Sequence, residues 1–207
     1  MKDYRIYIFD FDGTLCDTKE SLYQVFEDCF AAVGIYGITH AECEEFMHHT
    51  LKQAGEMKGV TEEQFPVFLD ACIKSIDRRE TIEKSKAFPE ALEILQKLKN
   101  SGKTLAVCSG NTTKHIKEVM EFLGWPEIFS GFMGSDIYVH GKPSAEPLLM
   151  CLDVLKETPK PDVVYIGDSL QDMEAARNAG IDGILVDREN QYTDYPGVKI
   201  KSLLEVL

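Results

Sequence analysis

The chain has 207 residues, 44% of them hydrophobic, and a formal net charge of -13 at pH 7. This length and apolar content suffice for a buried core and suggest one domain of usual size plus a smaller one. The negative charge disfavours nucleic acids and anionic membrane surfaces as partners, because either requires a basic patch. It leaves anionic small molecules open, since a few lysines and a divalent cation can reverse the potential locally.

The composition also predicts a compartment. The sequence contains no stretch of about 20 apolar residues, and no charged-then-apolar leader precedes Ile6, so we expect neither a membrane span nor a signal peptide. The six cysteines show no C-x-x-C spacing and several lie on apolar faces. We interpret them as reduced core residues rather than zinc ligands or disulfide partners, which predicts a cytoplasmic location.

The first predicted element is a strand at residues 6–9. It is apolar at every position, as in a parallel sheet that helices cover on both faces. The sequence D-F-D-G-T at residues 10–14 follows at once and should open at the carboxyl end of this strand, where open α/β sheets bind ligands. Asp10 can attack a substrate covalently, and Asp12 can exchange a proton with the leaving group. A plain surface turn is the alternative, since Asp-Gly is a common turn pair.

Residues 17–85 are predicted to form an all-helical module. Asp17 and Glu20 fit a capping box at the start of an amphipathic helix. Further helical patterns run over residues 40–49 and 62–79, and no convincing strand lies between them. Because the module directly follows the acidic turn, we expect it to cover the crevice as a lid.

Helices and strands alternate from residue 88 onward. The predicted helices cover residues 88–100, 112–123, 144–156 and 169–178, and the predicted strands cover residues 105–108, 128–133, 163–166 and 183–186. Such alternation predicts the α/β class, with a parallel sheet and helices on its faces. The expected domains are an α/β core at residues 1–16 and 86–207, and a helical cap at residues 17–85.

Three more polar segments are expected near the carboxyl ends of the strands, as the segment at residues 10–14 is. Ser109, Gly110 and Asn111 come after the strand at residues 105–108, and a hydroxyl with two backbone N–H groups that lead into a helix suits phosphate oxygens. Lys142 lies in a loop between a glycine and a proline. Taken singly, Ser109 is also explained as a helix cap and Lys142 as a solvated loop lysine.

The third segment adds two acids. Asp168 and Asp172 come after the strand at residues 163–166 and reach the same edge of the predicted sheet as Asp10 and Asp12. Four carboxylates at one crevice would repel each other unless a divalent cation and a cationic side chain compensated them. A hard oxygen site with open positions suits Mg2+.

The order D-x-D-G-T, S-G-N, G-K-P and G-D-S-x-x-x-D resembles the haloacid dehalogenase-like hydrolase superfamily, and the resemblance spans nearly the whole chain. The helical insertion after the first motif is similar to the cap of the branch that holds phosphoglycolate phosphatase and β-phosphoglucomutase. The resemblance implies a Rossmann-like parallel sheet core flanked by helices, with an inserted all-helical cap domain. It also implies an Mg2+-dependent phosphatase that hydrolyses a small phosphorylated metabolite through an aspartyl-phosphate intermediate.

The resemblance further implies a role for each motif residue. Asp10 would be the nucleophile and Asp12 the general acid and then base, while Ser109 and Lys142 would hold the phosphoryl group and Lys142 would also neutralise Asp10. The residues that would bind phosphate are Phe11, Ser109, Gly110, Asn111 and Lys142. The residues that would hold Mg2+ are Asp10, Asp12 through its backbone carbonyl, Asp168, and Asp172 directly or through water.

Alternative functions stay open at this point. A β-phosphoglucomutase-like phosphomutase would share every core residue, although no arginine-bearing cap loop is found near residues 48–52. A phosphonate hydrolase would need a cap lysine for an imine, for which Lys52 and Lys58 are the candidates. A non-catalytic phosphate-binding or regulatory protein is disfavoured by the intact acidic set. Dehalogenation is disfavoured by Asp12, because dehalogenases that resemble these motifs lack an acid there.

The sequence predicts neither the oligomeric state nor the physiological substrate. The candidates for substrate contact in the helical module are His48, His49, Thr50 and Lys52.

Overall fold

The computed structural model describes residues 2–47, 49–158 and 161–207, and the chain forms two compact units. The first unit consists of Met1–Asp17 and Ala87–Leu207, and the second of Thr18–Lys86. The second unit is thus inserted into the sequence of the first.

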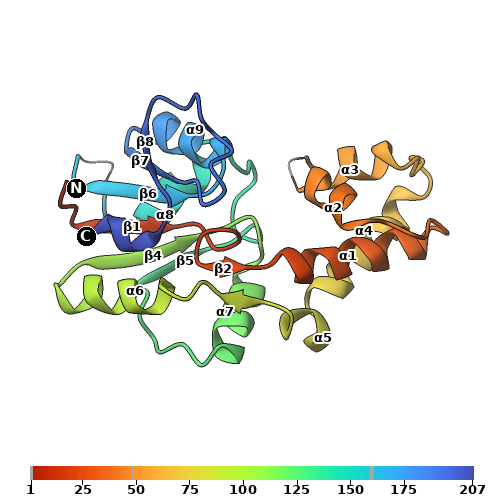
Figure 1. Cartoon of the computed structure of the whole chain (residues 1–207), viewed down its shortest axis with the longest axis horizontal. Helices are drawn as coiled ribbons and strands as arrows, with labels where there is room; N and C mark the ends of the chain where they lie inside the picture. Colours follow the sequence, from red (N-terminus) through yellow and green to blue (C-terminus); the bar gives the residue numbers. More distant parts are fainter. Residues whose placement is uncertain (1, 48, 159–160) are drawn as a thin grey trace. The chain divides into compact units, whose positions relative to one another are not determined.

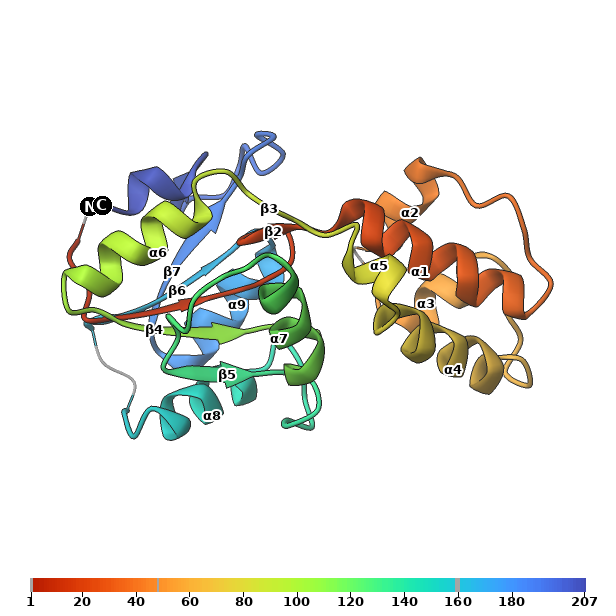
Figure 2. The same ribbon diagram turned by 90° about the horizontal axis from the view of Figure 1, so that it is seen from below.

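A parallel sheet forms the centre of the first unit. Among the described residues its strands are β1 (Ile6–Phe9), β4 (Thr104–Cys108), β5 (Gly131–Met133), β6 (Val163–Gly167), β7 (Asp182–Val186) and β8 (Val198–Ile200). They lie in the order β5-β4-β1-β6-β7-β8, and the order from β5 to β7 can be followed in Figure 2. Every pairing is parallel. The predicted α/β fold with a Rossmann-like parallel sheet is confirmed.

Helices cover both faces of this sheet. They are α6 (Ala91–Asn100), α7 (Thr113–Phe122), α8 (Glu146–Val154) and α9 (Leu170–Ala179), with a 3-10 turn, η1, at Leu203–Val206. Side chains alternate between the two faces of a strand, and Ile6 and Ile8 pack into one cluster with residues of α8 and α9. The helix α6 contacts β4 and η1 and lies on the other side of the sheet from α9 (Figure 1). Burial on both faces explains why β1 is apolar throughout.

The register of the central strands brings their ends together. Phe9, the last residue of β1, pairs with Val107 of β4 and with Ile166 of β6. The polar segments that follow these three strands therefore begin at the same edge of the sheet. Two of them lead into capped helices, because Thr112 accepts a hydrogen bond at the start of α7 and Ser169 forms a capping box at the start of α9.

The helices described in the second unit are α1 (Lys19–Ala32), α2 (His40–Phe46), α3 (Leu51–Met57), α4 (Phe65–Ile76) and α5 (Arg79–Ile82). Its core is a cluster of aromatic rings in which Phe30 lies 4.8 Å from Phe68 and 5.4 Å from Phe46, between ring centroids. The edge-to-face geometry of Phe30 and Phe68 is one that aromatic pairs prefer. Within the described ranges, no helix combines the length and apolar character that a membrane crossing requires.

Two local predictions were wrong. Asp17 does not cap α1, whose N-cap is Thr18 without a side-chain hydrogen bond, because Asp17 is extended in the short strand β2 (Cys16–Asp17) that pairs with β3 (Lys86–Ala87). The single helix expected at residues 40–49 is shorter, and α3 follows it as a separate helix. Thr50 and Gln53 begin α3 with a capping box, a signal that the sequence contains.

Candidate active site

The first motif forms a tight turn at the carboxyl end of β1. The Asp10 backbone N–H donates to the Ile166 carbonyl at 2.8 Å, so the end of β1 is tied to β6. Gly13 has a φ of 72°, and a Cβ at this position would collide with the carboxylate of Asp168. A glycine is therefore required for the turn to lie against Asp168.

A buried lysine stands between two of the acids. The Lys142 Nζ atom lies 3.1 Å from Asp10 Oδ1 and 2.6 Å from Asp172 Oδ1, and all three side chains are largely shielded from solvent. Burial alone would lower the pKa of Lys142, but the carboxylates of Asp10 and Asp172 outweigh it and raise this pKa well above its ordinary value. Lys142 is therefore a permanent cation that neutralises part of the acidic charge.

The acids outnumber this cation. Carboxylate oxygens of Asp10, Asp168 and Asp172 all lie within 4.8 Å of one another. Burial, followed by the charge of Asp172, raises the pKa of Asp168 to about 7. Burial also raises the pKa of Asp10, and the neighbouring carboxylates add to this increase although Lys142 opposes it. The raised pKa values show that the cluster holds its negative charge only at a cost, which a proton or a bound cation relieves. These hard oxygen donors fit a divalent cation such as Mg2+.

Asp172 differs from Asp168 in its hydrogen bonds. Its Oδ2 accepts bonds from the Ser169 backbone N–H and hydroxyl, at 3.0 and 2.7 Å, and its Oδ1 faces Lys142. The Asp168 carboxylate accepts a long bond from the Thr14 hydroxyl, at 3.4 Å, and a bond from its own backbone N–H. Asp168 therefore has more free acceptor capacity for a metal ion than Asp172.

Asp12 is held by the segment that follows β4. Its Oδ2 accepts hydrogen bonds from the Asn111 side-chain amide at 2.7 Å and from the Ser109 hydroxyl at 3.3 Å. Its Oδ1 is buried and has no hydrogen-bond partner within the described part of the chain. One carboxylate oxygen is thus fixed in place while the other is available for proton exchange.

The structure therefore brings most of the predicted site residues together at one edge of the sheet. Ser109 and Asn111 contact Asp12, two residues after Asp10. Lys142, Asp168 and Asp172 lie around Asp10 itself. The Phe11 side chain is fully buried, so only its backbone is available to a ligand, and Gly110 is exposed beside Ser109. The catalytic, phosphate-binding and metal-binding roles of these residues stay predictions.

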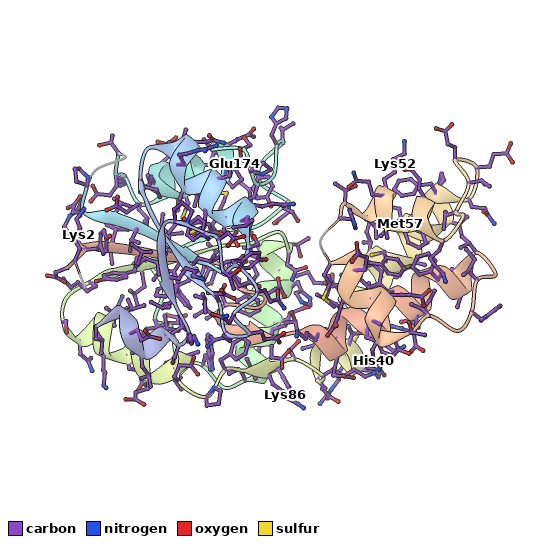
Figure 3. All side chains as sticks on the ribbon, turned by 45° about the horizontal axis from the view of Figure 1, so that its top comes forward. Lys2, His40, Lys52, Met57, Lys86 and Glu174 are labelled. Carbon is purple, nitrogen blue, oxygen red and sulfur yellow. The ribbon has the colours of Figure 1, made fainter. Side chains whose placement is uncertain are left out.

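The predicted substrate contacts in the helical unit lie apart from this set in the sequence. His48 is outside the described residues. His49 lies 3.2 Å from the Glu45 carboxylate, and the Thr50 hydroxyl is engaged in capping α3. Lys52 lies exposed on α3, 3.9 Å from Glu56 (Figure 3).

Sequence reasoning missed three side chains that support the site. The Tyr138 hydroxyl donates to the Ser109 carbonyl at 3.0 Å. Arg188 donates to the Thr14 carbonyl at 3.0 Å and to Glu90 at 2.6 Å. Tyr165, which the sequence places in an apolar strand, has its hydroxyl 3.1 Å from Lys142. The sequence contains one signal for Tyr165, which is its position two residues before the glycine of the G-D-S-x-x-x-D motif.

The sequence of the chain matches a known family over most of its length. Residues 7–186 match the haloacid dehalogenase-like hydrolases. The chain belongs to this family. The match confirms the resemblance seen in the four motifs and the expectation that the protein is a hydrolase.

Individual relatives extend the comparison. The chain is 29% identical over 194 residues to a phosphoglycolate phosphatase of Psychrobacter arcticus, which covers 87% of this chain and 82% of that protein. It is 29% identical over 206 residues to a phosphoglycolate phosphatase of Agrobacterium fabrum, with 94% and 84% covered. A crystal structure of a haloacid dehalogenase-like hydrolase from Bacteroides fragilis is similar with a TM-score of 0.88 and 27% identity, and covers 99% of this chain and 100% of that chain.

Proposed function

We propose that this hydrolase is an Mg2+-dependent phosphatase that hydrolyses a small phosphomonoester through an aspartyl-phosphate on Asp10. The observation that carries the proposal is the position of the Asp10 carboxylate, which lies at a strand end, 3.1 Å from the Lys142 ammonium and beside Asp168. The phosphatase names of the relatives from Psychrobacter arcticus and Agrobacterium fabrum support the same reaction class.

In the first half-reaction, a carboxylate oxygen of Asp10 forms a bond to phosphorus and the ester oxygen leaves. Asp12 gives a proton to this leaving oxygen, for which its Oδ1 is free while Asn111 and Ser109 hold its Oδ2. Lys142 offsets the negative charge that gathers around the phosphoryl group. The products of this step are the alcohol and phosphorylated Asp10.

In the second half-reaction, Asp12 takes a proton from water as the water oxygen bonds to phosphorus. The bond between phosphorus and Asp10 then breaks, which releases inorganic phosphate and restores the carboxylate. The same side chain thus acts first as an acid and then as a base.

The proposed metal ligands are Asp10, the backbone carbonyl of Asp12, and Asp168, with Asp172 as a further ligand or support. When bound, Mg2+ would supply charge neutralisation for the phosphoryl oxygens. The protein holds these acids close together. Gly13 allows the turn to lie against Asp168 because it has no side chain.

We propose that the helical unit, Thr18–Lys86, is the cap that selects the substrate, as its insertion directly after the acidic turn suggests. Its lysines favour a phosphatase over a phosphonate hydrolase. Lys58 forms an ion pair with Glu42 at 2.7 Å and Lys52 is exposed, whereas an imine-forming lysine is normally desolvated.

The test is the release of phosphate from p-nitrophenyl phosphate and from a panel of phosphorylated metabolites that includes phosphoglycolate. We expect turnover that requires Mg2+. We expect Asp10→Asn to lower kcat about a thousandfold or more, because this change removes the nucleophile but keeps the side-chain volume. The control is Asp182→Asn, since Asp182 is an exposed acid paired with Lys2. Retained turnover in Asp10→Asn would remove Asp10 from this role, and no turnover by the unaltered protein would favour a binding function.

A further inference from the structure

Tyr165 places a hydroxyl at the centre of the acidic site. Its ring is fully buried in the cluster that includes residues of α8 and α9, and its hydroxyl reaches the carbonyl of Cys108, the last residue of β4. A buried phenol needs hydrogen-bond partners, because an unpaired polar group in the interior is costly. The Tyr165 hydroxyl oxygen has three polar neighbours, which are Lys142 Nζ at 3.1 Å, Asp172 Oδ1 at 3.1 Å and the Cys108 carbonyl oxygen at 3.0 Å.

The Tyr165 hydroxyl is one of the polar groups that hold the Lys142 ammonium. An ammonium group has three N–H donors. Among the described residues, Lys142 donates hydrogen bonds to Asp172 Oδ1 at 2.6 Å and to the Tyr165 hydroxyl oxygen at 3.1 Å, and it forms an ion pair with Asp10 Oδ1 at 3.1 Å. Two hydrogen bonds and an ion pair to three different side chains restrict the orientation of the group. A lysine side chain is otherwise a flexible stem with a mobile charge.

The same hydroxyl also ties β6 to β4. These strands are not neighbours, because β1 lies between them in the sheet. The bond from the Tyr165 hydroxyl to the Cys108 carbonyl therefore spans the end of β1, where Asp10 is located. Cys108 directly precedes Ser109, whose hydroxyl donates to Asp12. One phenol thus connects the lysine to the strand end that carries the residues around Asp12.

We infer that Tyr165 is a positioning residue that fixes the Lys142 ammonium between Asp10 and Asp172. This inference rests on the proposed function. Tyr165 acts through Lys142 and takes no part in bond making or breaking. Without this hydroxyl, Lys142 loses a hydrogen bond that holds its ammonium, and the ammonium is free to turn away from Asp10.

The variant that isolates this effect is Tyr165→Phe, and Tyr7→Phe is its matched control. Tyr7 lies on the adjacent strand β1 and is 2% exposed. Its hydroxyl accepts a hydrogen bond from the Tyr4 backbone N–H at 3.3 Å, and neither residue belongs to the candidate active site. Each variant deletes one buried phenol oxygen and keeps the ring, so general loss of packing affects both alike.

The kinetic test compares these variants on one phosphomonoester with saturating Mg2+. We expect Tyr165→Phe to lower kcat about 10- to 100-fold with KM little changed, the effect of losing one hydrogen bond to a charged group that acts in the transfer step. Tyr7→Phe should keep the kcat of the unaltered protein. Equal kcat values for the two variants, with both folded by circular dichroism, would overturn the inference.

A second measurement does not depend on turnover. In protein labelled with 15N-lysine, a buried ammonium held by Asp172, Tyr165 and Asp10 should give a slowly exchanging N–H signal, and the absence of this signal in Lys142→Met assigns it. We expect this signal in the unaltered protein and in Tyr7→Phe, and its loss in Tyr165→Phe. Its persistence in Tyr165→Phe would overturn the inference. If the unaltered protein shows no turnover, the proposed function is refuted. The N–H signal still tests the role of Tyr165 in that case, because it does not require turnover.

Discussion

The α/β unit and the helical unit hold their polar residues in different ways. In the α/β unit, parallel pairing sets the ends of β4, β1 and β6 level, and the acids after those strands become neighbours. In the helical unit, aromatic packing sets the arrangement, and polar side chains such as Lys58 and Lys74 pair with nearby acids. Chemistry can therefore be inferred from motifs at strand ends, whereas specificity cannot be inferred from amphipathic helices. The following variants test this difference.

The largest effect is expected at the strand edge. Replacing Asp12 with Asn should lower kcat by about 100- to 10,000-fold, because a general acid contributes on this order. The loss should be greatest for esters with poor leaving groups, which need the proton most. The measurement is kcat for a series of substituted phenyl phosphates and alkyl phosphates.

These kcat values test whether Asp12 protonates the leaving group. An equal loss for every ester would show that Asp12 does not protonate the leaving group. The melting temperature should stay near that of the unaltered protein, because the Asn111 amide and Ser109 hydroxyl are both able to bond to an amide in place of the carboxylate.

The helical unit should respond to packing changes instead. Phe30→Ala removes a fully buried ring from the aromatic cluster and should cost about 3 to 5 kcal/mol of local stability. Hydrogen exchange followed by mass spectrometry should show lost protection in residues 18–86 and unchanged protection in β1 and β6. The matched control is Val67→Ala on α4, where the side chain is 52% exposed and the expected change is below about 0.5 kcal/mol. Equal loss of protection in both units would contradict two separately packed units.

The smallest effect is expected in the pH dependence of stability, through Asp168 of the α/β unit. Without metal, burial raises the pKa of Asp168 to about 7, so the folded protein binds this proton more tightly than the unfolded chain does. Lowering the pH from 8 to 6 should therefore stabilise the metal-free protein through this group, by about 1 kcal/mol. Mg2+ must displace the proton, so its stabilising effect should be larger at pH 8 than at pH 6.

Thermal unfolding with and without Mg2+ at the two pH values measures this dependence. Asp168→Asn should remove both the pH dependence from this group and most of the stabilisation by Mg2+. A stabilisation by Mg2+ that is as large at pH 6 as at pH 8 would show that Asp168 is not among the residues that bind it.

Much of the fold can be predicted from local patterns. The strands β1, β4 and β6 are continuous apolar runs, which are typical of strands buried on both faces. The strand β8 was missed because it has three residues with a lysine at its centre. The helix α3 was missed although Thr50 and Gln53 mark its start.

The side chains that support the site are harder to predict from the sequence than its acidic residues. The rule that polar residues after parallel strands meet at one edge finds Asp10 and Asp168 without knowledge of the strand order. The roles of Tyr165 and Arg188 depend on which strands and loops are neighbours in space. The order β4-β1-β6 is what allows the Tyr165 hydroxyl to reach the Cys108 carbonyl across β1, and chain order does not reveal it.

The measurement that tests the central claim most directly is the site of phosphorylation during turnover. Protein quenched with acid in the steady state with substrate and Mg2+ is digested and its peptides are sequenced by mass spectrometry. We predict a phosphoryl group on Asp10 that hydroxylamine removes, as expected for an acyl phosphate, and none in the Asp10→Asn variant. A phosphoryl group on Ser109 or another residue, or turnover with no phosphorylated protein, would contradict the account.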